Sequence, residues 1–187
     1  LTGSQGPSGD GHVFTTKAQL QTAVNAWNTD STDAEAEYGH ISTWNVSAIE
    51  DMVSLFNNKT NITSLDLSGW DTSNVTIMSG MFQNCEELTS LNVSNFDTSN
   101  VEYMNAMFLS CQSLTSLDVS SFDTSNVTSM ANMFSYCSSL TSITFGENFS
   151  GSDMNYMFSY CSYLTSLDLS SFDTSSVTGM TGMFYDC

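Results

Sequence analysis

Leu114-Thr-Ser-Leu-Asp-Val-Ser-Ser-Phe-Asp-Thr-Ser-Asn-Val-Thr-Ser-Met-Ala-Asn-Met-Phe-Ser-Tyr-Cys137 decides the fold of this 187-residue chain, because its pattern recurs at a fixed interval. The opening Leu-Thr-Ser occurs again at Leu88 and at Leu140, at equal distances before and after Leu114. Phenylalanine marks the same interval independently, at Phe56, Phe82, Phe108, Phe134, Phe158 and Phe184. A period of this length is typical of stacked structural units. We therefore predict about six 26-residue coils over residues 38–187, of which the fourth is two residues short.

Two apolar spacings alternate within each coil. Leu117 and Val119 alternate with polar residues, which predicts a short strand. Apolar residues over 130–137 are spaced i, i+3, i+4, i+7, which predicts a short helical or 3₁₀ segment. The turn formers Asp123-Thr-Ser-Asn126 lie between the two. Because a single unit of this kind cannot bury its apolar side, we predict a repeat solenoid, a right-handed coil with one parallel β-sheet.

The two ends of the chain differ. We predict a flexible N-terminal segment over residues 1–14, followed by a capping helix and a connector over 15–37. The helix is expected at 15–27, where Thr16 and Gln19 have the spacing of a capping box. At the other end, no cap follows the last coil before Cys187. We expect either that the protein continues beyond this point or that the uncapped end docks onto another subunit.

Charge excludes one class of partner. The chain has 20 acidic residues against two cations, Lys17 and Lys59, so its formal net charge is −18. Two lysines are too few to neutralise the phosphates of a nucleic acid, which excludes nucleic-acid binding. No apolar run approaches the roughly 18 residues of a membrane-spanning helix, so we predict no membrane insertion in this fragment.

The repeated motif Leu-Thr-Ser-Leu-Asp-Leu-Ser-x-Phe-Asp-Thr-Ser-Asn-Val-Thr-x-Met-x-x-Met-Phe-x-x-Cys resembles the bacterial surface protein 26-residue repeat family, a BspA-like group also found in mycoplasma lipoproteins and in secreted algal and protist proteins. The resemblance covers about residues 38–187. It implies a leucine-rich-repeat-like solenoid in a secreted or cell-surface protein that serves adhesion or protein contact. It implies no catalytic residues, and no catalytic motif is present in the sequence, so we expect no enzyme activity.

Five cysteines occupy one repeat position: Cys85, Cys111, Cys137, Cys161 and Cys187. As the last residues of the apolar stripe they are expected to face inward, where free cysteine packs as a small hydrophobe. We favour buried free thiols. The alternative is two bridges between neighbouring coils, Cys85–Cys111 and Cys137–Cys161.

Aspartates recur at the start of the turns. Asp71, Asp97 and Asp123 would stack in neighbouring coils, and an oxygen-rich cluster of this kind suits calcium. A turn-forming role for these aspartates is the favoured interpretation, since no EF-hand and no nonapeptide calcium-binding repeat is present. We predict no other cofactor or metal site.

Seven asparagines fit the acceptor pattern for N-glycosylation. They are Asn45, Asn58, Asn61, Asn74, Asn92, Asn126 and Asn148, of which Asn74 and Asn126 lie at equivalent positions in predicted turns.

The polar side of the predicted strands is the favoured interaction surface. We expect a protein or glycan at a cell surface to bind residues on this side: Ser116, Asp118, Ser120, Asp66 and Asp168. The alternative is a structural glycoprotein that assembles into a coat or filament through the uncapped end. A third interpretation is ice binding by regular threonine columns, of which Thr63, Thr89 and Thr115 are examples.

Overall fold

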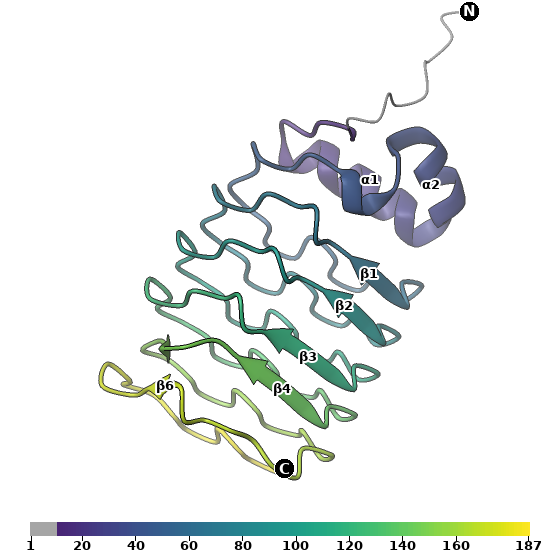
Figure 1. The fold of residues 1–187 in the computed structure, drawn as a ribbon. Helices are drawn as coiled ribbons and strands as arrows, with labels where there is room; N and C mark the ends of the chain where they lie inside the picture. Colours follow the sequence, from purple (N-terminus) through teal and green to yellow (C-terminus); the bar gives the residue numbers. More distant parts are fainter. Residues whose placement is uncertain (1–10) are drawn as a thin grey trace, which may run out of the picture.

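The computed structural model describes residues 11–187, so most of the predicted flexible segment 1–14 lies outside the described residues. The described chain winds into a stack of coils with two helices at one end (Figure 1). Neighbouring coils contribute the strands β1 (Ser64–Asp66), β2 (Ser90–Asn92), β3 (Ser116–Val119) and β4 (Ser142–Phe145). β1 pairs with β2 and β3 with β4, in parallel and with equivalent residues of successive repeats opposite each other. The predicted parallel pairing of strands one repeat apart is therefore confirmed.

The prediction of one continuous sheet is wrong, because the described residues form three separate two-stranded sheets. β2 and β3 are in contact without a strand ladder between them, and the third sheet pairs β5 (Phe149–Ser150) with β6 (Phe172–Asp173). A second ladder of single parallel bridges joins the coils in the order Asp51, Ile77, Tyr103, Ser129, Asp153 and Gly179. Each of these coils is thus bonded to its neighbours along a second line, apart from the strands.

The predicted short helical segments are successive turns instead. In the stretch 130–137, the Met133 N–H donates to a carbonyl three residues back at 3.1 Å. The next N–H, of Phe134, donates at 2.9 Å to the carbonyl of Met157 in the following coil. An α-helix would use every interior N–H within its own segment and leave none for the next coil. The turns instead require a left-handed residue, and Asn132 takes this conformation with φ of 58°.

A column of phenylalanine rings runs through the stack. Centroids of neighbouring rings lie 5.3–5.6 Å apart and their planes are within 16° of parallel. The column consists of Phe56, Phe82, Phe108, Phe134, Phe158 and Phe184. All are fully buried except Phe184, which is 49% exposed. Methionines, leucines and four of the cysteines pack around it, so the main core is one continuous set of like side chains.

The short coil closes its core with different residues. Phe149 is fully buried and stacks on Phe172 at a centroid distance of 5.0 Å, while Phe145 meets each of the two edge-on at 4.9 Å. The Ser150 N–H donates to Thr124 Oγ1 at 2.7 Å and links this coil to the one before it. The stack therefore continues across the coil that lacks the Asp-Thr-Ser-Asn turn.

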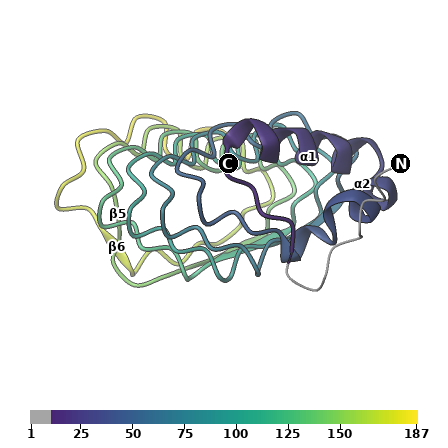
Figure 2. The ribbon, with the colours of Figure 1, turned by 90° about the horizontal axis from the view of Figure 1, so that it is seen from above.

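Helix α1 (Lys17–Thr29) lies across the first coil, as Figure 2 shows from above. Its buried residues are Leu20, Ala23 and Val24. The capping interaction predicted at its start is present, since Thr16 Oγ1 accepts the Gln19 N–H at 3.3 Å. The Gln19 side chain, however, accepts the backbone N–H of Thr15 at 3.1 Å and not that of Thr16.

A second helix, α2 (Ser31–Tyr38), occupies the segment predicted to be a connector. Asp30 starts this helix, because its side chain accepts the N–H groups of Thr32 at 2.9 Å and Asp33 at 3.2 Å. A 3₁₀ turn, η1 (Ile41–Thr43), then leads into the coils. Short polar helices of this kind carry little periodic signal, which explains why apolar spacing does not reveal α2.

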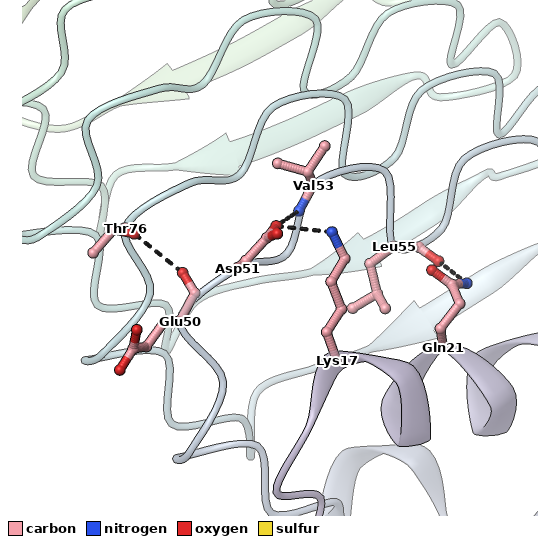
Figure 3. A network of polar contacts seen from close by, with 7 residues as sticks. All are labelled: Lys17, Gln21, Glu50, Asp51, Val53, Leu55 and Thr76. Atoms are coloured by element: carbon pink, nitrogen blue, oxygen red, sulfur yellow. Dashed lines mark hydrogen bonds and ion pairs between the residues drawn. The ribbon is translucent and has the colours of Figure 1, made fainter.

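Two side chains of α1 tie the helices to the coils (Figure 3). The Gln21 amide donates to the Leu55 carbonyl at 2.8 Å, and the Lys17 ammonium lies 2.8 Å from the Asp51 carboxylate. Burial acts to raise the pKa of Asp51, but Lys17 and the Val53 N–H outweigh it and hold this pKa below its usual value. The cap is thus joined to the stack by polar contacts as well as by apolar packing.

Candidate functional site

The strands present the predicted interaction face to solvent. Along β3, Ser116 and Asp118 are exposed while Leu117 and Val119 are buried. Ser116 pairs with Ser142 and Asp118 with Thr144 of β4, so equivalent polar side chains stand side by side. The remaining predicted residues are also exposed: Asp66 on β1, Ser120 directly after β3, and Asp168 outside any strand in a later coil. These residues, together with the outward residues of β2 and β4, are called the strand face below.

The carboxylates of the strand face are held by their own backbone. Asp118 Oδ1 accepts the Ser120 N–H at 2.9 Å, and Asp168 Oδ1 accepts the Ser170 N–H at the same distance. Two hydrogen bonds from Ser120 lower the pKa of Asp118, and the bond from its hydroxyl contributes more than the bond from its N–H. The Ser170 N–H and hydroxyl lower that of Asp168 in the same way. Asp66 also accepts the Asn92 amide of the next coil at 3.0 Å. The strand face is therefore a row of oriented, ionised carboxylates among hydroxyl groups.

The turn aspartates act on their own turns. Asp71, Asp97 and Asp123 each accept the N–H of the serine two residues later, at 2.9–3.1 Å. Ser99, through its hydroxyl and its N–H, lowers the pKa of Asp97. Among residues 11–187, no three or more His, Cys, Asp or Glu side chains come together in a way that would hold a metal ion. The three calcium candidates act as turn formers, and Asp97 lies close enough to Asp123 for its charge to act against the lowering of the pKa of Asp123.

Side chains of the turns also link the coils. The Asn74 amide donates to the Ser47 carbonyl at 2.8 Å, and the Asn126 amide donates to the Ser99 carbonyl at 2.6 Å. In the turn of the coil between these two, the hydroxyl of Thr98, which is 1% exposed, donates to the Asp123 carbonyl at 2.8 Å. All seven asparagines of the acceptor pattern are exposed: Asn45, Asn58, Asn61, Asn74, Asn92, Asn126 and Asn148. Whether any carries a glycan stays a prediction.

The cysteines form an inward column of thiols. Cys85, Cys111, Cys137 and Cys161 are buried and free, and Cys187 is free and exposed. Each thiol donates to a phenylalanine carbonyl of the preceding coil at 2.9–3.2 Å, as Cys111 does to Phe82 at 3.2 Å. Burial raises the pKa of Cys85 and of Cys161 to about 12. Raised pKa values of this kind make a thiol unreactive, so the column is suited to packing and not to chemistry.

A second exposed feature is a group of tyrosines that the sequence interpretation did not single out. Tyr136 and Tyr160 lie at one repeat position in adjacent coils, and their rings stack at a centroid distance of 4.3 Å. Tyr185 meets Tyr160 edge-on at 5.5 Å. Tyr156 lies beside them and is 42% exposed, while Tyr136 is 47% exposed. The four rings are called the tyrosine cluster below.

The tyrosine cluster surrounds a hollow of about 580 Å³. Its other lining residues are small or polar and uncharged: Asn132, Ser135, Ser159, Thr181 and Gly182. Ser135 and Ser159 form a buried hydrogen bond at 2.7 Å in its floor. The hollow lies within the size range of roughly 300–1,000 Å³ that is usual for small-ligand sites.

Three of these tyrosines have an unusual backbone conformation. Tyr136, Tyr156 and Tyr160 have φ of 59°, 55° and 59°, in the left-handed region. This region costs a bulky residue of order 1–3 kcal/mol. Earlier coils place Asn58 and Asn84 at the position of Tyr136 and Tyr160, and asparagine tolerates this conformation better. The signal in the sequence is therefore the presence of Tyr136 and Tyr160 at a repeat position that other coils fill with Asn58, Asn84, Ser110 and Asp186.

These observations define a class, a repeat protein built of stacked coils whose exposed residues form extended faces. A family model described as "Mycoplasma protein of unknown function, DUF285" matches residues 30–144 and 118–187. The chain belongs to this family, in agreement with the repeat family that its motif resembles. Searches of the curated proteins and of the solved structures find no match. Among residues 11–187, neither helix is long and apolar enough to cross a membrane.

Proposed function

We propose that the chain is an extracellular or cell-surface interaction module, a right-handed leucine-rich-repeat-like solenoid that binds a protein or glycan on another surface without catalysis. The observation that carries the proposal is the strand face, where Ser116 and Asp118 of β3 stand beside Ser142 and Thr144 of β4 and face solvent. A rigid, extended row of this kind fits a large partner better than a small substrate.

The arrangement of reactive residues supports a non-catalytic role. His40 bonds its near neighbour Ser42 at 2.8 Å, and His12 packs against Phe14 with ring centroids 4.7 Å apart. The buried thiols have raised pKa values, and the aspartates are occupied with their own turns. His40 Nδ1 also accepts the Ser42 N–H at 3.3 Å, so its contact with this serine caps the η1 turn.

Binding to cells tests the proposal. Asp66→Lys combined with Asp118→Lys reverses the charge of the strand face, while Glu50→Lys combined with Glu102→Lys makes the same change in charge at exposed sites outside it. With fluorescently labelled protein and a panel of bacterial and eukaryotic cells, we expect at least a tenfold loss of binding for the first pair and little change for the second. Absence of binding to every surface, or equal loss for both pairs, contradicts the proposal. Circular dichroism checks that both variants keep the fold.

A further inference from the structure

The tyrosine cluster has features that the stack does not require. Tyr136 is 47% exposed although its coil is covered on both sides, so its exposure does not come from a missing neighbour. It takes the left-handed conformation at a position where Asn58 and Asn84 take the same φ of 58°. The left-handed backbone recurs at this position in other coils, as at Ser110 with φ of 61°, so the distinguishing feature of this site is an exposed aromatic ring where those coils carry a smaller polar residue.

The neighbouring residues leave room for the rings. Gly182, with φ of 59°, lies directly under the Tyr156 ring, and a side-chain carbon at this position would collide with that ring. Tyr160 is fixed between Tyr136, stacked at 4.3 Å, and Tyr185, edge-on at 5.5 Å. The rings are therefore held in place before any ligand arrives, which lowers the entropy cost of binding.

The chemistry of the hollow selects the ligand class. Its lining has no charged residue, and the only lysines of a chain without arginine, Lys17 and Lys59, belong to the cap and the first coils. With a net charge of −18, the protein repels anionic ligands. Aromatic faces carry partial negative charge and attract the weakly positive C–H groups of a sugar ring. Asn132 and Thr181 at the rim offer both donors and acceptors for sugar hydroxyls.

We propose that the tyrosine cluster, with Asn132 and Thr181, binds a neutral glycan by stacking hexose rings on Tyr136 and Tyr156, with Tyr160 holding the Tyr136 ring in place. The proposal rests on the proposed interaction function and adds a ligand class and a site separate from the strand face. Tyrosine suits this task because it supplies a large rigid contact area together with a hydroxyl group at low entropy cost. Loss of solvation and the adjacent phenols of Tyr136 and Tyr185 raise the pKa of Tyr160 to about 12, so this phenol stays uncharged in neutral media.

A glycan microarray with neutral and sialylated oligosaccharides is the first test, followed by calorimetric titration of the best neutral oligosaccharide. We expect retention of neutral hexose-containing glycans and none of sialylated ones. Tyr136→Asn combined with Tyr160→Asn introduces the residue found at this position in earlier coils. We expect it to lower affinity at least tenfold while the unfolding midpoint stays within a few degrees of the parent, because strain relief offsets the lost ring contact. Expression in a host without N-glycosylation keeps the new side chains unmodified.

Tyr163→Asn is the matched control, because Tyr163 is 67% exposed and does not line the hollow. It is expected to leave glycan affinity unchanged. Equal affinity of the double variant and the parent, retention of sialylated glycans alone, or binding of a polyproline peptide in place of sugars would overturn the proposal. If the parent protein binds cells, the strand-face variant does not, and no glycan is retained on the array, the proposed function stands and the tyrosine site is refuted. If the protein binds neutral glycans on the array but binds no cell, the tyrosine site stands and the proposed function is refuted.

Discussion

Phe108→Ala probes the stacked core at its centre. Phe108 is fully buried and stacks on Phe82 at 5.6 Å and on Phe134 at 5.5 Å, so its removal leaves a cavity and two rings without a partner. Truncation of a buried phenylalanine costs about 3–5 kcal/mol, and the two lost stacks place this site toward the upper end. Phe184 is 49% exposed and stacks only on Phe158 among the phenylalanines of the column, so for Phe184→Ala we expect about 1–2 kcal/mol.

Urea unfolding followed by far-ultraviolet circular dichroism measures both changes. With a total stability of about 5–15 kcal/mol, Phe108→Ala should move the midpoint strongly, and the slope m shows whether the coils still unfold together. An equal cost for Phe108→Ala and Phe184→Ala would refute the reasoning, because it would mean that the rings do not form one buried column. A lowered m for Phe108→Ala alone would instead show that the stack separates into halves at this coil.

Other predictions concern the turns and the thiols. Thr98→Val removes the donor to the Asp123 carbonyl and should cost about 1–3 kcal/mol in urea unfolding, whereas Thr115→Val at an exposed site should stay within about 0.5 kcal/mol. Alkylation at pH 8 followed by mass spectrometry should modify Cys187 alone in the folded protein and all five cysteines in urea; two native bridges would leave only one reactive thiol in urea. Because the pKa of Asp97 is lowered in the folded state, its contribution to stability is present above about pH 4 and is lost as the pH falls through the folded-state pKa. Asp97→Asn should accordingly flatten the dependence of the melting temperature on pH between 2 and 5, and an unchanged slope would contradict this assignment.

The regular part of the fold could be predicted because like residues must superimpose. Fixed spacing of Phe82, Phe108 and Phe134 predicts one column, and the rings are stacked within 7° of parallel. The alternation around Leu117 predicts the strand at β3 and its parallel partner one repeat later. These features depend on burial, which the apolar period reports directly.

The turn segments could not be predicted in the same way. Their apolar spacing is that of a helix, yet alternate N–H groups bond the next coil, as Phe134 does to Met157. Hydrogen bonds of the backbone to the next coil do not depend on which side chains are apolar, so the apolar spacing gives the wrong structure here. The small or turn-forming residues at the left-handed positions, such as Gly80, Asn84 and Asn132, carried the only sequence signal.

The two candidate surfaces also differ in how far the sequence predicts them. Polar residues of the strand face follow from alternation, so Ser116 and Asp118 could be placed on the outside before the structure was known. The tyrosine cluster combines residues from three successive coils, and its character comes from the backbone conformation of Tyr136 and Tyr160. A single sequence without that conformation suggests only two exposed aromatic residues, which are common on protein surfaces.

The energy of the tyrosine stack can be compared with the cost of its backbone conformation. One stacked pair such as Tyr136 and Tyr160 contributes about 0.5–1.5 kcal/mol beyond the area that it buries. The left-handed conformation costs a bulky residue of order 1–3 kcal/mol at each of the two positions. Asparagine, as at Asn84, meets the same backbone requirement at lower cost, and Asn84 also bonds Asn58 of the previous coil at 3.1 Å. The stacking contribution by itself therefore does not offset the backbone cost of tyrosine at these two positions. A contact outside the fold, of the kind proposed for the neutral glycan, gives the residue choice a physical reason that the fold alone does not supply.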